Sequence, residues 1–325
     1  MLHNRGRVNP ETEARVRRII KELNYHTNIF AKHLKMGRVF TFAVLMPRPP
    51  QDSYYWLLPY RGIEKAQQEL VSHRVRASFF FFDRFNEKSV LTTGQKLLKV
   101  RPDGLLTAPV LPGSFLQFCP SLPPGLPLVF FDSYIPGLKP LTFIGQDAFQ
   151  SGLLASRLMR QTIHRKKGLV LIVKILPEDY HIIERMEGFL RGSRDWPGFR
   201  TEVLELGGSW TAAETRALLE AFYQKHRDLA GIFVTNAMTH KVAEWWKGNS
   251  AREKIILIGY DPIPKNIKLL KQGAIDFLLS QQSERQGYEG LYALFRQVVL
   301  GEEVKPRIMT QIDIITADNV DYYQS

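Results

Sequence analysis

Side chains that can bind a polyhydroxyl compound follow several apolar runs of this 325-residue sequence. Asp132, Asn236 and Asp261 each come at or just after the end of such a run. Carboxylate and amide groups are planar and present paired acceptors or donors, which suits vicinal hydroxyl groups. Tyr55 and Trp56 follow the first run and offer flat faces to the C–H side of a sugar ring. These residue types therefore predict a sugar or a sugar derivative as the ligand.

Gln281, Phe149 and Trp210 complete the polar and aromatic groups of this set. A purine is the alternative ligand, because aromatic stacking together with Arg and Asp side chains would also hold a base. Taken alone, each residue has an ordinary structural role: an aspartate caps a strand end, and a tryptophan fills a core. Their joint placement favours ligand contact.

The elements that would position these residues alternate between strand and helix. Apolar runs typical of strands are Thr41 to Met46, Ala77 to Phe82, Gly104 to Ala108, Leu128 to Phe131, Gly168 to Val173, Gly231 to Val234 and Ile255 to Ile258. Amphipathic runs typical of helices are Gly62 to His73, Ser89 to Lys99, Ser151 to Thr162, Ile182 to Ser193, Thr211 to His226, Thr239 to Lys247 and Gln286 to Leu300. This alternation predicts a doubly wound α/β fold, in which ligands bind beyond the carboxyl ends of the strands.

The N-terminal segment is strongly basic. Residues 1 to 38 contain nine Lys or Arg against three Glu, so that six of the twelve net positive charges lie there. Asn9 and Pro10 are typical of a helix start, and a second short helical pattern runs from residue 28 to 36. Such a segment attracts a phosphate backbone through counterion release. A solvated helix with a basic face is the alternative.

The same segment resembles the lactose-repressor (LacI/GalR) family of bacterial transcription regulators. The resemblance lies in Leu2-His3-Asn4-Arg5-Gly6-Arg7-Val8-Asn9-Pro10-Glu11-Thr12, in Leu23-Asn24-Tyr25, and in Asn28 to Arg38. In that family these stretches are the end of the recognition helix, the third headpiece helix, the hinge helix and the linker. The family's helix-turn-helix begins further upstream, so we expect a partial headpiece here.

The resemblance implies a fold and a division of the chain. The partial headpiece would span 1–38 with its hinge helix at 28–36, and an effector-binding core of two Rossmann-like lobes, of the type I periplasmic-binding-protein kind, would span 39–325. Its N-lobe would comprise about 39–145 and 283–308, and its C-lobe about 146–282 and 309–325. Three crossover strands would join the lobes.

The resemblance also implies a function and further site residues. It implies a cytoplasmic, dimeric regulator, a repressor by analogy, that binds operator DNA and senses a small molecule in the cleft. Arg185 matches the family's Arg-x-x-Gly-aromatic motif, and Trp210 the place of a pocket aromatic. Leu34 would be the minor-groove wedge. The DNA-contacting residues would be Arg5, Arg7, Asn28, Ala31, Leu34 and Lys35.

At two positions the sequence departs from the family's pattern, which limits what the resemblance implies about the ligand. Asn236-Ala237 and Asp261-Pro262 stand where the family usually has Asn-Asp and Asp-Asp, so the ligand of a better-known relative is not transferred.

Two other functions fit the two-lobe body: a sugar-binding protein of a transport system, and a partner that binds effector but not DNA. The segment after Met1 lacks the apolar region of a signal peptide, which argues against the first.

Enzymatic functions find little support in the sequence. It contains no Gly-x-x-x-x-Gly-Lys, no Gly-x-Gly-x-x-Gly after a strand and no His-Glu-x-x-His, and we expect no cofactor and no metal site. The single Cys119 excludes an intramolecular disulfide. The stretch from Glu178 to His181 offers metal or acid–base groups, but we expect a solvated loop there.

Overall fold

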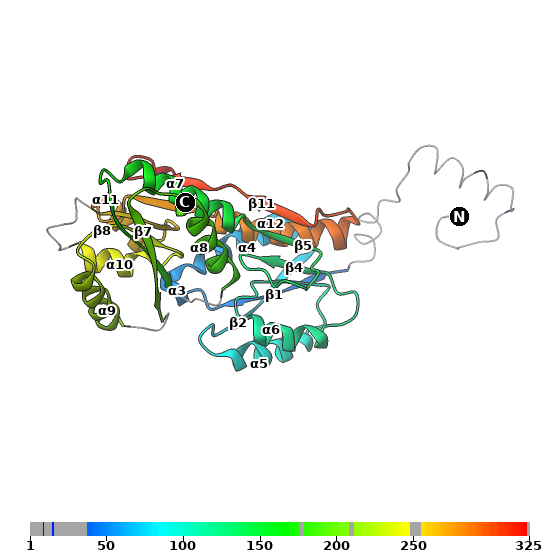
Figure 1. Cartoon of the computed structure of the whole chain (residues 1–325). Helices are drawn as coiled ribbons and strands as arrows, with labels where there is room; N and C mark the ends of the chain where they lie inside the picture. Colours follow the sequence, from blue (N-terminus) through cyan, green and yellow to red (C-terminus); the bar gives the residue numbers. More distant parts are fainter. Residues whose placement is uncertain are drawn as a thin grey trace.

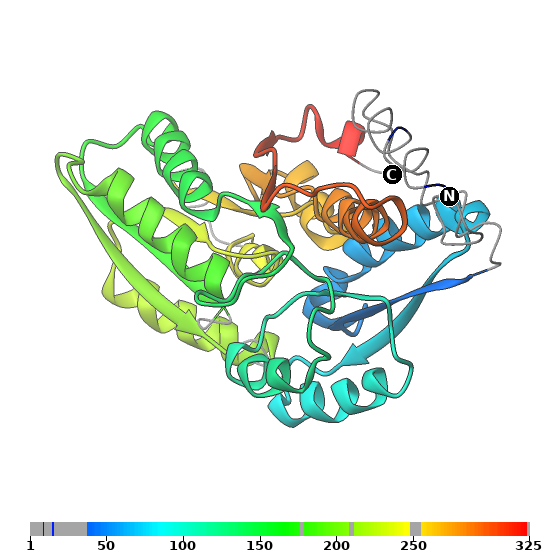
Figure 2. The ribbon, with the colours of Figure 1, turned by 90° about the vertical axis from the view of Figure 1, so that its right-hand side faces the viewer.

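The computed structural model describes residues 9, 15, 38–175, 179–207, 211–247 and 255–323. Apart from residues 9, 15 and 38, the predicted headpiece with its hinge helix lies outside these ranges, as do all six predicted DNA-contacting residues. Figures 1 and 2 show two α/β lobes side by side. The predicted fold class, two Rossmann-like lobes with parallel sheets, is confirmed.

Each lobe is built on a six-stranded sheet. The first sheet has the order β11-β5-β4-β3-β1-β2 and the second the order β12-β10-β9-β8-β6-β7. Strands of the first sheet are β1 (Phe40–Pro47), β2 (Val75–Phe82), β3 (Gly104–Thr107), β4 (Leu128–Phe131), β5 (Thr142–Gln146) and β11 (Arg307–Thr310). Strands of the second are β6 (Gly168–Ile175), β7 (Phe199–Leu206), β8 (Leu229–Val234), β9 (Ile256–Tyr260), β10 (Phe277–Ser280) and β12 (Asp313–Ile315). Neighbouring strands are parallel except β10 and β12.

Helices cover both faces of each sheet. Those associated with the first lobe are α3 (Gln51–Tyr54), α4 (Leu57–Leu70), α5 (Glu87–Leu98), α6 (Pro112–Phe118) and α12 (Ser283–Phe295), which continues as a π-helix at Arg296–Leu300. Those of the second are α7 (Ala148–Thr162), α8 (Tyr180–Ser193), α9 (Ala212–Lys225), α10 (Thr239–Trp246) and α11 (Pro264–Lys271). Short 3-10 turns occupy Val71–His73, Cys119–Ser121 and Val320–Tyr323. No helix among these described residues is long and apolar enough to cross a membrane.

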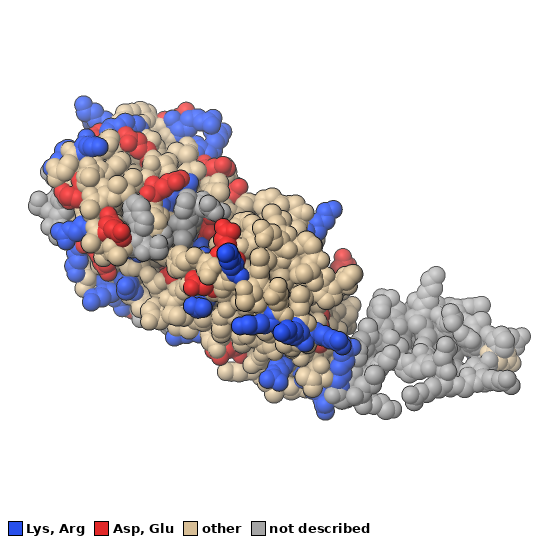
Figure 3. Space-filling view, turned by 90° about the horizontal axis from the view of Figure 1, so that it is seen from below, with Lys and Arg blue, Asp and Glu red and all other residues tan. Residues whose placement is uncertain are grey.

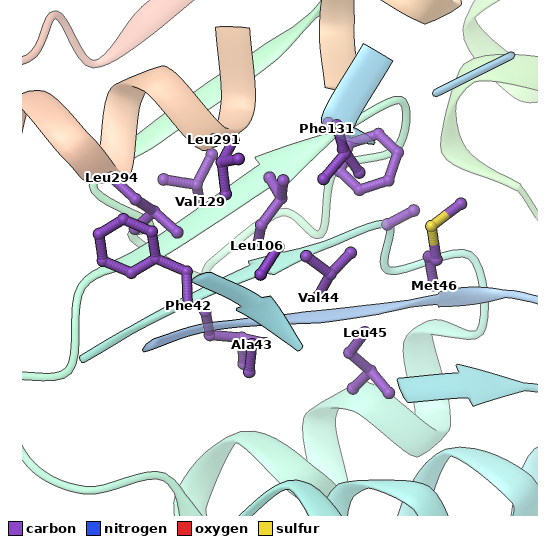
Figure 4. Close-up of a cluster of buried hydrophobic side chains, with 14 of the residues drawn as sticks. Phe42, Ala43, Val44, Leu45, Met46, Leu106, Val129, Phe131, Leu291 and Leu294 are labelled. Carbon is purple, nitrogen blue, oxygen red and sulfur yellow. The ribbon is translucent and has the colours of Figure 1, made fainter. Parts of the chain in front are cut away.

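The core of the first lobe forms around β1, which is almost entirely buried, as a parallel strand covered on both faces must be. Figure 4 shows the side chains of Phe42 and Val44 on the side of Leu291 and Leu294 from α12. Leu45 points to the opposite face of the sheet, toward the helices drawn in cyan. Alternation along the strand thus binds one helical layer to each face.

The chain passes between the sheets three times, after β5, after β10 and after β11. These passages place the carboxyl ends of both sheets at the junction of the lobes. Figure 1 shows α3 at this junction, where Ser53 Oγ lies 3.1 Å from His240 Nε2 of α10. Figure 3 shows Lys and Arg interspersed with Asp and Glu over the second lobe, so neither sign of charge dominates that face.

Five strands lie outside the strand-like runs predicted from the sequence: β5, β7, β10, β11 and β12. Four of them are only three to five residues long, and β7 contains the charged residues Arg200, Glu202 and Glu205 among its apolar ones. The helices α3, α6 and α11 were also not predicted; α6 and α11 each begin at a proline, and neither exceeds eight residues. Short elements give too few positions for a periodic pattern.

Candidate functional site

A small buried cavity lies where the strand ends of the two lobes meet. Its volume is about 20 Å³. The lining residues are Asp52, Tyr55, Trp56, Arg84, Asp132, Asp179, His181, Arg185, Asn236, Ala237, Met238, Asp261 and Gln281. Two larger hollows, of about 400 and 600 Å³, lie on the surface beside α7 and beside α4 and α12. Only a few of the residues that line these two hollows are buried, whereas all the residues that line the small cavity are buried. The convergence of buried polar groups marks the small cavity as the candidate site.

The first loop of the cavity has an unusual backbone. Asp52, Ser53 and Tyr54 have φ of 51°, 59° and 71°, a left-handed turn that costs L-residues about 1–2 kcal/mol each. Trp56 Nε1 donates to Asp52 Oδ2 over 2.7 Å, within the same turn. Non-glycine residues persist in this conformation where the surroundings hold them, as is common at ligand sites. The strained turn places Asp52, Tyr55 and Trp56 in the cavity.

Arg84 joins the two lobes at the cavity. Its guanidinium group donates to Asp52 in its own lobe, and Nη2 donates to Asp179 Oδ2 of the other lobe over 2.6 Å. All three side chains are about 95% buried. Burial raises the pKa of Asp179 to about 6, although the Arg84 guanidinium opposes the shift. One arginine thus offsets only part of the cost of burying two carboxylates.

Asp132 follows β4 with a φ of 64° and receives a hydrogen bond from the Tyr55 hydroxyl. The backbone N–H of Asp132 donates to Gln286 Oε1 over 2.9 Å. Burial raises the pKa of Asp132 to about 6, and the tyrosine bond acts in the opposite sense. His181 Nδ1 lies 4.0 Å from Asp132 Oδ2, and burial with two nearby arginines holds the pKa of His181 well below 6.5. The imidazole is therefore neutral at pH 7.

A second polar network belongs to the other lobe. Arg185 Nη2 donates to Gln281 Oε1 over 3.0 Å, and Gln281 Nε2 donates to Asp261 Oδ2 over 2.9 Å. The remaining Nη1 of Arg185 donates to the Thr235 carbonyl over 2.9 Å, and the guanidinium carbon lies 3.7 Å from the ring centroid of Tyr260. These contacts hold the guanidinium plane in one orientation. Burial raises the pKa of Asp261 to about 6.

Five buried polar atoms around the cavity have no hydrogen-bond partner among the described residues. They are Asp52 Oδ1, Arg84 Nε, Asp132 Oδ2, His181 Nδ1 and Arg185 Nε. Buried polar groups are nearly always paired, so each such group calls for an explanation. Two carboxylate acceptors beside two guanidinium donors match hydroxyl groups, each of which donates and accepts.

Metal chemistry finds no site in the described part of the chain. No group of three or more His, Cys, Asp or Glu side chains there is arranged to hold a metal ion. The carboxylates of the cavity are instead bonded to arginine, tyrosine and glutamine.

Comparison with known proteins assigns the fold to a family. A model of the periplasmic binding protein domain matches residues 42–303. The chain belongs to the periplasmic binding protein domain family. The strand-end cavity therefore lies inside the matched domain.

Three relatives of this periplasmic binding protein domain are informative. The xylose/arabinose-binding protein XylF of Sulfolobus acidocaldarius is 24% identical over 223 residues, which cover 61% of this chain and 52% of that protein, so the match spans about half of its length. A candidate LacI transcriptional regulator from Bacteroides fragilis superimposes with a TM-score of 0.81 at 27% identity, covering 88% of this chain and 100% of that one. An ABC-transporter solute-binding protein from Burkholderia graminis, in complex with D-arabinose, gives a TM-score of 0.76 at 20% identity, covering 88% and 98%.

Seven of the nine residues predicted to contact an effector line the cavity of this periplasmic binding protein domain. They are Tyr55, Trp56, Asp132, Arg185, Asn236, Asp261 and Gln281. The amide of Asn236 is engaged with backbone, since Nδ2 donates to the Ile175 carbonyl and Oδ1 accepts from Met238 N–H. Phe149 does not line the cavity: it lies in α7, where its carbonyl oxygen faces Gly188 of α8. Trp210 lies outside the described residues.

Sequence reasoning missed several cavity residues. The expectation of a solvated loop at Glu178 to His181 is wrong for Asp179 and His181, which are only 4% and 8% exposed. Both come after β6 and before or within the first turn of α8, and Arg84 comes two residues after β2. The strand-end rule that found Asp132 could therefore have found them.

Proposed function

We propose that this chain is a receptor that binds a monosaccharide between its two lobes. The observation that carries the proposal is the set of five unpaired buried polar atoms on one cavity. Hydroxyl groups of a sugar would pair with the carboxylates of Asp52 and Asp132 and with Nε of Arg84 and Arg185. Trp56 and Tyr55 add aromatic surface from the same turn.

The names of the relatives support the same class of ligand. XylF is named for xylose and arabinose, and the Burkholderia protein holds D-arabinose. The cavity volume of about 20 Å³ holds about one water molecule, and a ligand pocket is typically several hundred. A sugar would therefore enter only when the lobes move apart, which would break contacts such as that between Arg84 and Asp179. Ligand affinity would then depend on the balance between two arrangements of the lobes.

Calorimetric titration of the 325-residue chain with neutral pentoses and hexoses tests this proposal, with adenine and hypoxanthine as the alternative ligand class. We expect at least one sugar to bind and Asp132→Asn to weaken that binding. Asp228→Asn is the matched control, because Asp228 is a surface carboxylate bonded to Arg200 in the second lobe. Binding of a purine without binding of any sugar would overturn the proposal.

A second function, regulation of transcription, is favoured by two further observations. The Bacteroides regulator has a higher TM-score and sequence identity than the arabinose complex. The basic segment 1–38, with a net charge of six, carries the resemblance to a headpiece and hinge. We propose that sugar binding in the core is linked to contact of this segment with DNA, in a homodimer whose hinge helices pair around Leu34.

Duplex binding by the chain, followed by fluorescence anisotropy across a salt series, tests this second function. The expected result is a steep salt dependence that weakens when residues 1–38 are removed, and a change in affinity when the sugar is added. A removal that leaves the salt slope and the affinity unchanged would refute a DNA-binding role for this segment. The sugar-binding proposal would stand in that case.

A further inference from the structure

We infer that the monosaccharide bound by this chain carries no negative charge, and that sugar acids and sugar phosphates are excluded from the cavity. This inference rests on the proposed sugar-binding function and narrows its ligand class to neutral sugars and amino sugars. It follows from the charges that line the cavity and from the way its two arginines are already engaged.

The cavity wall has an excess of negative charge. Four aspartates line it, at positions 52, 132, 179 and 261, against the two arginines Arg84 and Arg185, which leaves a net charge of −2. His181 is neutral, because its pKa is well below 6.5. Half-buried Lys241 of α10 also acts on Asp52 from beyond the wall, and including it leaves a net charge of −1. A carboxylate or phosphate on the ligand would meet net repulsion on either count.

Arg185 presents no free fork to an anion, and Arg84 keeps one terminal nitrogen bonded to Asp52. Recognition of a carboxylate or phosphate by arginine is typically bidentate, through two parallel N–H groups. In Arg185 both terminal nitrogens are bonded within the second lobe, to Thr235 and Gln281. When the lobes move apart, Arg84 keeps its bond to Asp52 of its own lobe and loses the one to Asp179, whose carboxylate then lies at the same wall without its cation. In the present arrangement of the lobes, Nε of each guanidinium is unpaired. A single N–H such as Nε of Arg185 suits a hydroxyl oxygen, so the contacts of Arg185 favour alcohols over acids.

The raised pKa values of the carboxylates indicate that the nearby positive charge compensates them only in part. Burial raises the pKa of Asp132, Asp179 and Asp261 to about 6 in each case, despite the nearby arginines. Each aspartate is thus only partly compensated by its surroundings. The charge of a further anion in this enclosed space would be uncompensated. A neutral hydroxyl carries no charge that needs compensation, and a protonated amine would be attracted to the carboxylates.

Matched ligand series test the inference on the full chain at pH 7.5. Each series comprises a neutral hexose, its 2-amino form, its uronate and its 6-phosphate, built on glucose and on galactose, and affinity is measured by calorimetry. In any series that binds, we expect the uronate and the phosphate to be at least about tenfold weaker than the neutral sugar. A uronate or phosphate that binds as tightly as its neutral parent would overturn the inference and leave the sugar-binding proposal intact.

A charge-removing variant separates electrostatic exclusion from a simple steric limit. Asp179→Asn lowers the negative charge of the cavity wall by one, so the affinity for the uronate should rise at least about threefold relative to that for the neutral sugar. Asp228→Asn makes the same chemical change on the surface of the same lobe and should leave this ratio unchanged. An unchanged ratio in Asp179→Asn would overturn the electrostatic explanation. Failure of every sugar in both series and in the pentose titrations would overturn the sugar-binding proposal itself.

Discussion

Asp132 and Asp261 occupy matching positions in the two lobes. Each is the first residue after a strand, β4 or β9, and each has a left-handed backbone, with φ of 64° and 61°. The N–H of each donates to a carbonyl of the neighbouring strand, Ile144 or Leu279. The two carboxylates therefore approach one cavity from opposite sides. Each lobe thus places one of these two carboxylates on the wall of the cavity.

Replacing Asp132 by Asn tests its contact with the sugar. Asparagine tolerates the left-handed backbone at this position, so the fold should persist. Loss of a charged acceptor should weaken sugar binding by about 1.5–3 kcal/mol, or roughly tenfold to a hundredfold, as measured by calorimetry. Asp261→Asn should lose less, because both carboxylate oxygens of Asp261 already accept from Gln281. Unchanged affinity in both variants would remove these carboxylates from the site.

The buried ion pairs of Arg84 should contribute more to the free energy of unfolding than an exposed ion pair does. Arg84→Met leaves Asp52 and Asp179 buried without their shared cation, which should cost about 3–5 kcal/mol in the free energy of unfolding by urea. Arg200→Met breaks an exposed pair with Asp228 and should cost less than about 1 kcal/mol. Equal losses in the two variants would mean that Arg84 does not hold buried charge.

The pH dependence of stability should report on Asp261. Its folded pKa of about 6 exceeds the ordinary 3.8, so its contribution to stability is fully present below pH 3.8 and is lost as the pH rises through 6. The stability of Asp261→Asn relative to the natural chain should therefore rise between pH 4 and 7, by up to roughly 3 kcal/mol.

Asp228→Asn should show the opposite slope. Hydrogen bonding to Arg200 lowers the pKa of Asp228, so its stabilising contribution is present above pH 3.8 and is lost on acidification. Urea unfolding at each pH measures both slopes. A slope of the same sign in both variants would contradict the assigned effect of burial on Asp261.

Close helix packing gives a further prediction. A Cβ at Gly188 of α8 would lie 2.0 Å from the carbonyl oxygen of Phe149 in α7, so Gly188→Ala must force the helices apart. We expect a loss of about 1–3 kcal/mol. Because α8 also carries Arg185, sugar affinity should fall as well. Gly113→Ala in α6 has open space around its Cβ and should be neutral or slightly stabilising in the same urea titration.

Part of this site could be predicted from the sequence. Asp132, Asn236 and Asp261 follow apolar runs, and parallel strands bring their carboxyl ends to one edge, so position along the chain was sufficient. Phe149 shows the limit of such reasoning. It follows β5 closely, but three residues after the strand it is already in a helix that packs on α8.

The sequence by itself determined a doubly wound α/β fold, since long apolar strands and amphipathic helices are local patterns set by burial on two faces or on one. The division into two lobes was implied by the resemblance to a known family. Tertiary structure alone decided the pairing of the short strand β11 with β5, the pairing of β12 with β10, and the contact of Arg84 with Asp179. These groups lie 95 residues apart in sequence, and their contact depends on how the lobes close. A local sequence pattern does not indicate which distant charges will come into contact. The cost of burying each charge is offset only when its partner is in contact with it.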